Sequence, residues 1–402
     1  LKFLSLKNRY KKYYTTMKHA KIILCCLWAA VCIIGCRSSE KNAESPRPAV
    51  IAYVGGYRGL VDVEAISAEK ITHINYAFVN LVDGRATLSN EATDTVNLRA
   101  LHRLKNDNPQ LKILISIGGW TWSGTFSDAV LTPQGRDLLA SSAARIVEDY
   151  DLDGVDIDWE YPGFGGLEGN VVRAEDKQNY TRMFALRARL DSLSQLTGKE
   201  YLLTTAVGGF KKFLDYTEMD KAQRYLDFVN LMTYDYYPDT LAVHHTNLYA
   251  SDLYPEANSG DIAFRAFRQA GVPAEKLVMG ISFSSRAFRL KEGSKTGPGD
   301  TVIAQTRGGG GFTRIKDSLE NRPGYLKGWD QAACAPYLFH PEELLFLTYD
   351  DERSVGEKCR YVLENGMGGV MFWEYFSDPK EYLLDAIVAA FDPTDSTAVS
   401  KT

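Results

Sequence analysis

The sequence predicts an α/β fold class, a (β/α)8 TIM barrel with a small α+β insertion between strands 7 and 8. Three observations point to it. Eight short apolar runs alternate with longer amphipathic stretches, functional-looking side chains follow several runs, and one interval between runs is unusually long. Strands that alternate with helices pair in parallel, and eight such units favour a closed barrel. An open doubly wound sheet is the alternative, disfavoured because no Gly-x-Gly-x-x-Gly turn follows the first run.

Each expected strand is a short apolar run. The runs are Val50–Tyr53, Ile71–Val79, Leu111–Gly118, Gly154–Glu160, Tyr201–Val207, Phe228–Tyr234, Leu277–Phe283 and Gly369–Tyr375. Helix-like stretches between them include Gly135–Tyr150, Lys177–Leu196, Ile262–Ala270 and Ser354–Asn365.

The long interval precedes the last run, where roughly 80 residues replace a usual unit of about 30. Its excess, residues 287–349, holds a glycine-rich turn and enough apolar residues to fold as a small inserted domain. In a barrel this insertion lies on the face where the carboxyl ends of the strands open, which is the catalytic face. The expected catalytic barrel is therefore 49–286 and 350–392, with 393–402 as a tail.

Composition bounds the class of protein. Apolar residues make up 45% and charged residues 24% of the chain, as in globular proteins with a sizeable core. The net charge of −5 and the scattered basic residues argue against nucleic acid as a partner. The 23 Tyr, 18 Phe and 6 Trp fit either a packed core or a cleft in which flat rings stack on a ligand.

The N-terminal region has the features of an export signal. Residues 1–16 precede Met17, a plausible start, and two lysines then lead into the apolar run Ile22–Ile34. That run is too short to span a bilayer but suits a signal peptide. With Cys36 it resembles a bacterial lipoprotein signal, in which the cysteine carries the lipid. We expect an extension and signal over 1–35, lipidation at Cys36 and a tether over 36–48.

This signal predicts an exported lipoprotein, anchored to a bacterial membrane on the periplasmic side or the cell surface. A plain secretory signal is the alternative. Only Cys334 and Cys359 remain outside the N-terminal region, and two distant cysteines favour free, buried thiols over a disulfide framework.

The most informative segment runs from Asp153 to Glu160 and holds four carboxylates in a strand-like context. Because side chains alternate along a strand, Asp156, Asp158 and Glu160 share one face, whereas Asp153 has the opposite parity and is interpreted as structural, at a strand-to-helix junction. Carboxylates this close raise at least one pKa, as a general acid near neutral pH requires. A solvated edge strand and a hard-cation site are the alternatives.

Other candidates follow different expected strands, so a barrel brings them to one mouth. The third run ends in Ser116-Ile117-Gly118-Gly119-Trp120 with Trp122 just beyond, the sixth contains Met232, Tyr234 and Asp235, Arg286 follows the seventh, and the eighth holds Trp373. Tyr53 lies in the first run.

The acidic segment fits the D-x-x-D-x-D-x-E signature of family 18 glycoside hydrolases, the chitinases and their relatives. Ser116-x-Gly118-Gly119 and Met232-x-Tyr234-Asp235 resemble the other two landmarks of that family. The resemblance covers Val50 to Phe391, and the insertion is similar to the small α+β domain of the subgroup with a deep cleft.

The resemblance implies a retaining, substrate-assisted mechanism, in which the substrate replaces the missing second carboxylate. Glu160 would protonate the glycosidic oxygen while the 2-acetamido oxygen of the sugar attacks the anomeric carbon. Asp158 would accept a hydrogen bond from the acetamido N–H, and Asp156 would share a proton with Asp158. Tyr234 would hold the acetamido oxygen in line.

It also implies that Asp235 and Arg286 bind the sugar and each other, and that Trp373 forms the floor beneath it. The other expected substrate-binding residues are Trp120, Trp122, Tyr53 and Met232, and the expected supporting residues are Ser116, Asp153, Gly118 and Gly119. No cofactor or metal is implied.

The leading hypothesis is thus a monomeric chitinase acting on chitin or N-acetylglucosamine oligosaccharides. The alternatives are an endo-β-N-acetylglucosaminidase acting on N-glycans and an inactive chitin-binding lectin, which the intact Glu160 disfavours. Two departures from the family pattern affect the sugar subsites: Ser284 stands where a cleft tyrosine is common, and Glu374 follows Trp373 where relatives have a small or aromatic residue.

Overall fold

A computed structural model of the chain describes residues 47–238, 240–255 and 258–392. The expected signal, Cys36, most of the tether and the C-terminal tail lie outside these residues. The described residues from Pro48 onward belong to one compact unit.

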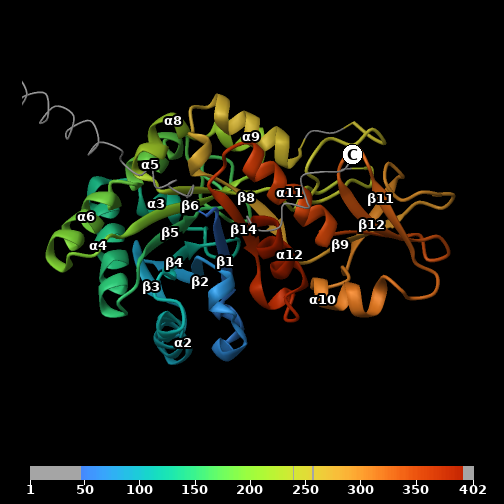
Figure 1. The fold of residues 1–402 in the computed structure, drawn as a ribbon. Helices are drawn as coiled ribbons and strands as arrows, with labels where there is room; N and C mark the ends of the chain where they lie inside the picture. Colours follow the sequence, from blue (N-terminus) through green and yellow to red (C-terminus); the bar gives the residue numbers. More distant parts are fainter. Residues whose placement is uncertain (1–46, 239, 256–257, 393–402) are drawn as a thin grey trace, which may run out of the picture. The chain divides into compact units, whose positions relative to one another are not determined.

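The eight expected strands form a closed parallel barrel, which confirms the predicted fold (Figure 1). The barrel strands are β1 (Ala49–Gly55), β2 (His73–Val82), β4 (Lys112–Gly118), β5 (Gly154–Asp158), β6 (Leu202–Gly208), β7 (Phe228–Met232), β8 (Leu277–Ser282) and β14 (Gly369–Trp373). Neighbours pair in the order β1-β14-β8-β7-β6-β5-β4-β2, and pairing of β1 with β2 closes the barrel. A short strand not predicted, β3 (Arg85–Leu88), pairs antiparallel with the end of β2.

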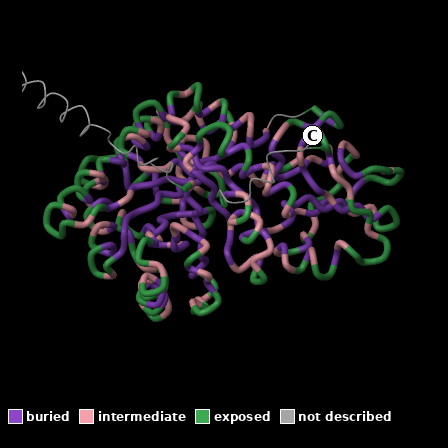
Figure 2. The backbone as a smooth tube through the Cα atoms, in the orientation of Figure 1, coloured by how far each residue is buried: buried purple, intermediate pink, exposed green. Residues whose placement is uncertain are grey.

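The barrel strands are buried on both faces, so their sequences are nearly continuous apolar runs (Figure 2). On β1, Val50, Ala52 and Val54 belong to the large core between barrel and helices. Ile51 and Tyr53 belong to a second, smaller cluster shared with other strands. The alternation has period 2, which identifies the smaller cluster as the interior of the barrel.

The helices lie outside the strands. The longer ones are α2 (Glu91–Arg103), α4 (Pro133–Asp149), α5 (Asp176–Met183), α6 (Leu186–Thr197), α9 (Gly260–Gln269), α11 (Glu352–Glu364) and α12 (Tyr382–Phe391), and the short ones are α3 (Phe126–Ala129), α7 (Lys211–Asp215), α8 (Met219–Ala222) and α10 (Phe312–Arg314). The single helix expected over Lys177–Leu196 is two helices, because i→i+3 hydrogen bonds at Phe184 and Ala185 interrupt the α-helical pattern.

A second sheet lies between β8 and β14 in the chain, where the insertion was expected. Its strands are β9 (Arg286–Leu290), β10 (Val302–Thr306), β11 (Leu326–Asp330), β12 (Ala335–His340) and β13 (Leu345–Thr348), all antiparallel in the order β10-β9-β13-β12-β11. Phe288, Leu290, Phe339 and Phe346 form its own small apolar cluster. Figure 1 shows this sheet beside α10, α11 and α12.

Two further expectations concern cysteines and membranes. Cys334 and Cys359 are both free, and Cys359 is buried as expected, whereas Cys334 is partly exposed because it lies in the turn between β11 and β12. Among the helices that the structure describes, none is both long and apolar enough to cross a membrane.

Candidate active site

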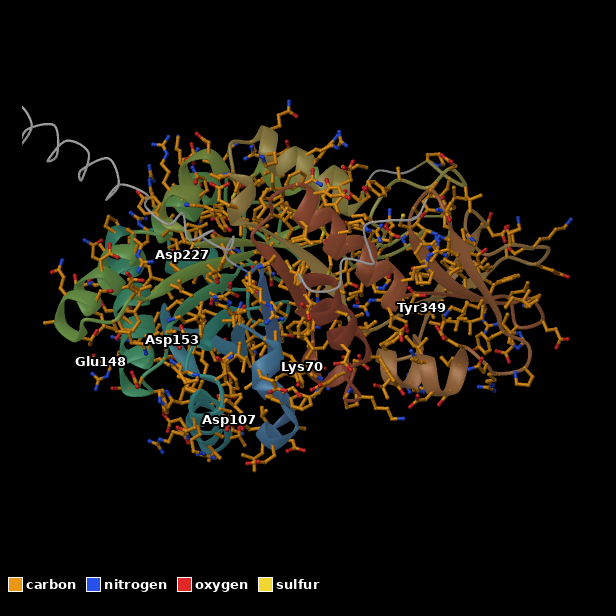
Figure 3. The ribbon with its side chains drawn as sticks, viewed as in Figure 1. Lys70, Asp107, Glu148, Asp153, Asp227 and Tyr349 are labelled. Atoms are coloured by element: carbon orange, nitrogen blue, oxygen red, sulfur yellow. The ribbon has the colours of Figure 1, made fainter. Side chains whose placement is uncertain are left out.

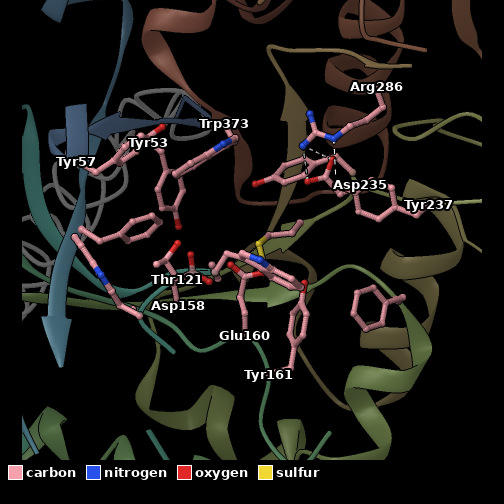
Figure 4. A pocket seen from close by; sticks show the side chains of 18 residues that line it. Tyr53, Tyr57, Thr121, Asp158, Glu160, Tyr161, Asp235, Tyr237, Arg286 and Trp373 are labelled. Carbon is pink, nitrogen blue, oxygen red and sulfur yellow. Dashed lines mark hydrogen bonds and ion pairs between the residues drawn. The ribbon is translucent and has the colours of Figure 1, made fainter. Parts of the chain in front are cut away.

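A pocket of about 650 Å³ opens at the carboxyl ends of the barrel strands (Figure 4). Its size is typical of a site for a small molecule or a few sugar units. Eleven residues singled out from the sequence line it: Tyr53, Gly118, Trp120, Trp122, Asp158, Glu160, Met232, Tyr234, Asp235, Arg286 and Trp373. In Figure 4, Asp158, Glu160 and Tyr161 lie along one side of the pocket and Trp373 lies across from them.

Glu160 stands just beyond its strand. The ladder of β5 ends at Asp158, two residues before the predicted end. Beyond it the backbone N–H of Glu160 donates to Ser123 Oγ at 2.8 Å, and its carbonyl accepts from Asn170 Nδ2 at 3.0 Å. Side chains therefore replace the ladder at this point and fix the position of the carboxylate at the rim.

The environment of Glu160 suits a general acid. Burial raises the pKa of Glu160 from 4.5 to about 7, a hydrogen bond from the phenol of Tyr161 lowers it, and the negative charge of Asp235 raises it. At neutral pH a large fraction of this carboxyl is protonated, so it can donate a proton.

Asp158 lies next along the barrel axis and is 3% exposed. Burial raises its pKa well above the usual value, and the charges of Glu160 and Asp156 add to the effect. Its Oδ1 atom is buried and has no hydrogen-bond partner among the described residues. A buried acceptor without a partner is costly, so this oxygen is set to receive a donor from a bound molecule.

Asp156 lies deeper, in the interior of the barrel. Both of its oxygens accept hydrogen bonds, from Tyr53 Oη at 2.9 Å, Ser116 Oγ at 2.7 Å, Thr204 Oγ1 at 2.6 Å and Asn230 Nδ2 at 3.4 Å. Burial raises the pKa of Asp156, and these donors offset part of the rise. The proton relay expected between Asp156 and Asp158 has no hydrogen bond within the described part of the chain, because four other donors occupy Asp156.

Tyr234 and Asp235 follow β7, which is two strands away from β5 in the barrel. The hydroxyl of Tyr234 has a weak acceptor, Met371 Sδ, at 3.7 Å. Asp235 forms an ion pair with Arg286 at 2.7 Å and lies 3.5 Å from Nδ1 of the buried His245. Although burial alone would raise the pKa of Asp235, His245 and Arg286 hold it below the usual value, so this side chain stays an anion beside Glu160.

Aromatic rings complete the pocket. Trp373 is nearly parallel to Phe78, with ring centroids 5.4 Å apart and an interplanar angle of 21°. Trp122 and Phe78 form a T-shaped pair with ring centroids 6.5 Å apart, and Trp120, 48% exposed, forms another with Tyr161 at 6.4 Å. Faces of such rings bind the apolar faces of sugars.

Asp153 lies at the other end of the barrel, before β5 begins (Figure 3). It pairs with Lys105 at 2.6 Å and Lys199 at 3.3 Å, and it accepts a hydrogen bond from the backbone N–H of Ile113. The structural interpretation fits these contacts, but the expected strand-to-helix junction is wrong, because this residue lies where α4 leads into β5.

Several lining residues were not singled out from the sequence: Tyr57, Phe78, Thr121, Tyr161, Ala206, Phe210 and Tyr237. Tyr161 directly follows the acid and could have been found by its position. The donors to Asp156 could have been found by parity on β6 and β7, but His245 comes from an irregular segment that no pattern predicts.

Neither departure noted in the sequence lines the pocket. Ser284 pairs with Gly311 in an isolated β-bridge. Glu374 is buried and forms an ion pair with Arg58 at 2.9 Å. No group of three or more His, Cys, Asp or Glu side chains within the described ranges is arranged to hold a metal ion.

Comparison with known proteins agrees with this geometry. Residues 49–378 match the model of the glycosyl hydrolases family 18. Chitinase A1 of Niallia circulans is 34% identical over 88% of this chain and 60% of that protein. Chitinase B of Serratia marcescens is 30% identical over 83% of this chain and 79% of that protein.

Among solved structures, the chain resembles a family 18 N-acetylglucosaminidase from Paenibacillus barengoltzii. The TM-score is 0.78 at 40% identity, over 85% of this chain and 99% of that one. With the barrel, the D-x-x-D-x-D-x-E segment and the pocket at its carboxyl end, the chain belongs to family 18 of the glycoside hydrolases.

Proposed function

We propose that this protein hydrolyses the β-1,4 bonds of chitin and chitooligosaccharides by a retaining, substrate-assisted mechanism. The names of the similar chitinases and of the N-acetylglucosaminidase support a substrate built from N-acetylglucosamine. The observation that carries the proposal is one buried acid of raised pKa, Glu160, beside the unpartnered buried oxygen of Asp158.

In the first step Glu160 protonates the glycosidic oxygen as the bond to the anomeric carbon breaks. The acetamido oxygen of the same sugar attacks that carbon and forms an oxazolinium-like intermediate. Asp158 accepts the hydrogen bond of the acetamido N–H and stabilises the positive charge that develops there. The Tyr234 hydroxyl, which has only a weak acceptor in the free protein, donates to the acetamido oxygen and aligns it.

In the second step Glu160, now an anion, takes a proton from water that attacks the anomeric carbon. The two displacements give net retention. No carboxylate of the enzyme serves as the nucleophile, so the reaction requires a 2-acetamido group on the sugar at the cleaved bond. Cellulose and starch are therefore not substrates.

The test compares the wild-type protein with Glu160→Gln on chitohexaose. Gln keeps the shape of the side chain but cannot supply a proton, and general-acid catalysis typically contributes 10²–10⁴-fold. We expect turnover to fall by at least about 10²-fold while chitohexaose still binds. Glu148→Gln is the control, because this residue is exposed on the outer helix α4 (Figure 3). Wild-type turnover by Glu160→Gln would contradict the assignment.

The same assay with a high-mannose glycoprotein separates the second candidate. Release of the glycan, with chitohexaose left intact, would favour an endo-β-N-acetylglucosaminidase. Binding of chitohexaose without hydrolysis by the wild-type protein would favour a lectin.

We also propose that the protein is exported and anchored through a lipid on Cys36, and that it is a monomer. The apolar run followed by this cysteine supports the anchor. Labelled palmitate should be incorporated by the wild-type chain in a bacterial host and lost in Cys36→Ser. Unlabelled protein in the medium would instead indicate a secreted enzyme, and light scattering would measure the oligomeric state.

A further inference from the structure

Two dipeptides face each other at one end of the pocket. Tyr57 and Arg58 belong to the 3₁₀ turn Gly56–Arg58 that follows β1, and Trp373 and Glu374 lie at the end of β14, the parallel neighbour of β1. Tyr57 and Trp373 line the pocket. The rings of Tyr57 and Trp373 are 6.3 Å apart with an interplanar angle of 13°. Arg58 Nη2 lies 2.9 Å from Glu374 Oε1. We call these four residues the clamp.

The ion pair between Arg58 and the buried Glu374 holds the clamp together. The side chain of Glu374 is 1% exposed, and it also accepts hydrogen bonds from the backbone N–H of Phe376 and from Ser377 Oγ. A buried carboxylate keeps its cation, since leaving it unpaired is costly. Arg58 therefore stays on Glu374 although its own side chain is 53% exposed, and its guanidinium lies 5.5 Å from the centre of the Tyr57 ring.

The position of the acid gives the pocket a direction. If the sugar that is cleaved lies on Trp373, its anomeric carbon faces Glu160, and its 4-hydroxyl is on the far side of the pyranose ring. Tyr237 lies toward the other end of the pocket, with Asp235 and Arg286 (Figure 4). The clamp thus lies on the non-reducing side of the cleaved sugar, where the next unit of a longer chain would continue.

The clamp leaves little space for that unit. Carbon atoms in contact are 3.5–4.0 Å apart, so a sugar between two parallel rings needs at least about 7 Å between the ring planes. The centroids of the Tyr57 and Trp373 rings are 6.3 Å apart, so their planes are separated by no more than this distance. A sugar therefore does not fit between the two rings. The ring of Tyr57 also packs directly over Gly55, where an added Cβ would lie 2.6 Å from the ring. The ring therefore has no room to move toward β1.

We propose that the clamp ends the cleft after a single sugar, so that the enzyme removes one N-acetylglucosamine at a time from non-reducing ends. This inference rests on the proposed function, since it assumes that the cleaved sugar is N-acetylglucosamine on Trp373.

The experiment uses chitohexaose labelled at its reducing end, with products measured in the first few per cent of reaction. Release of one sugar gives labelled pentaose together with free N-acetylglucosamine, which is the expected result. Labelled tetraose or shorter fragments as the main first products would overturn the inference while leaving the proposed function intact. No hydrolysis at all would instead refute the proposed function.

Two variants test the clamp itself. Arg58→Ser with Glu374→Ala removes both charges, so no buried carboxylate is left unpaired, and Tyr57→Ala removes the ring alone. In at least one of them we expect the ratio of labelled tetraose to pentaose to rise tenfold or more. Arg99→Ser is the matched control, because Arg99 on α2 lies over the ring of Tyr150 at 5.6 Å. Unchanged products from both folded variants would contradict the role of the clamp.

Discussion

Glu160→Gln should stabilise the protein, and it should do so increasingly as the pH rises. Burial raises the pKa of Glu160 from 4.5 to about 7, so the folded state holds this proton more tightly than the unfolded state does. For a carboxyl with a raised folded-state pKa, the stability that its protonated form gives is complete below the unfolded pKa. That stability is lost as the pH rises through the folded pKa. Gln carries no charge at any pH and escapes this loss.

The size of the effect follows from the two pKa values. At 1.36 kcal/mol per pKa unit, ionising Glu160 costs the folded state about 3 kcal/mol above pH 7. Unfolding entropy is about 2.1 cal/mol/K per residue, or roughly 0.7 kcal/mol/K for a unit of about 350 residues. The melting temperature of Glu160→Gln, relative to the wild type, should therefore rise by about 5 °C between pH 4.5 and pH 8.5.

The assay is thermal unfolding of both proteins across that pH range, with Glu148→Gln as the control for removing one acid. Only the Glu160→Gln difference should grow with pH. A difference that stays constant from pH 4.5 to pH 8.5 would show that Glu160 does not carry the raised pKa. The interpretation of this residue as the general acid would then lose its electrostatic support.

Three further predictions concern buried polar contacts. Tyr161→Phe removes a hydrogen bond that lowers the pKa of Glu160, so the basic limb of the pH profile of kcat/KM should move to higher pH; a shift to lower pH would contradict the contact. Asp156→Ala leaves four buried donors without the carboxylate that accepts from them. The free energy of unfolding in denaturant titrations should fall by at least about 3 kcal/mol. An unchanged value would mean that water replaces the carboxylate. Lys358→Met leaves the buried carboxylate of Asp350, 2.6 Å from Lys358 Nζ, without its cation. The free energy of unfolding in denaturant titrations should fall by about 3–5 kcal/mol. A fall below about 1 kcal/mol would show that this ion pair is dispensable.

Much of the fold was predictable because barrel strands are buried on both faces and therefore leave short apolar runs in the sequence. The eight runs correspond to the eight barrel strands. The elements missed have weaker patterns. β3 is only four residues long, and α5 and α6 form one continuous amphipathic stretch whose interruption at Phe184 leaves no sequence signal.

The candidate site was also predictable only in part. Period 2 along β5 predicted that Asp156 and Asp158 share one face of the strand. Asp156 accepts hydrogen bonds from Tyr53 and Thr204 on other barrel strands, and Asp158 lines the pocket above it. The same rule extended the strand to Glu160, whose position depends instead on Ser123 and Asn170, supplied by two separate loops. Such contacts join residues far apart in the chain, and no local pattern encodes them.

The sequence by itself determined the family, the order of the strands and the acidic segment, because those depend on residue types at fixed local spacing. Only the tertiary structure decided which groups occupy the oxygens of Asp156, that Asp158 Oδ1 is buried without a partner, and that Glu374 pairs with Arg58 and does not line the pocket. The reason is physical. Burial and hydrogen bonding set pKa values and close one end of a cleft, and both depend on which distant segments the fold brings together.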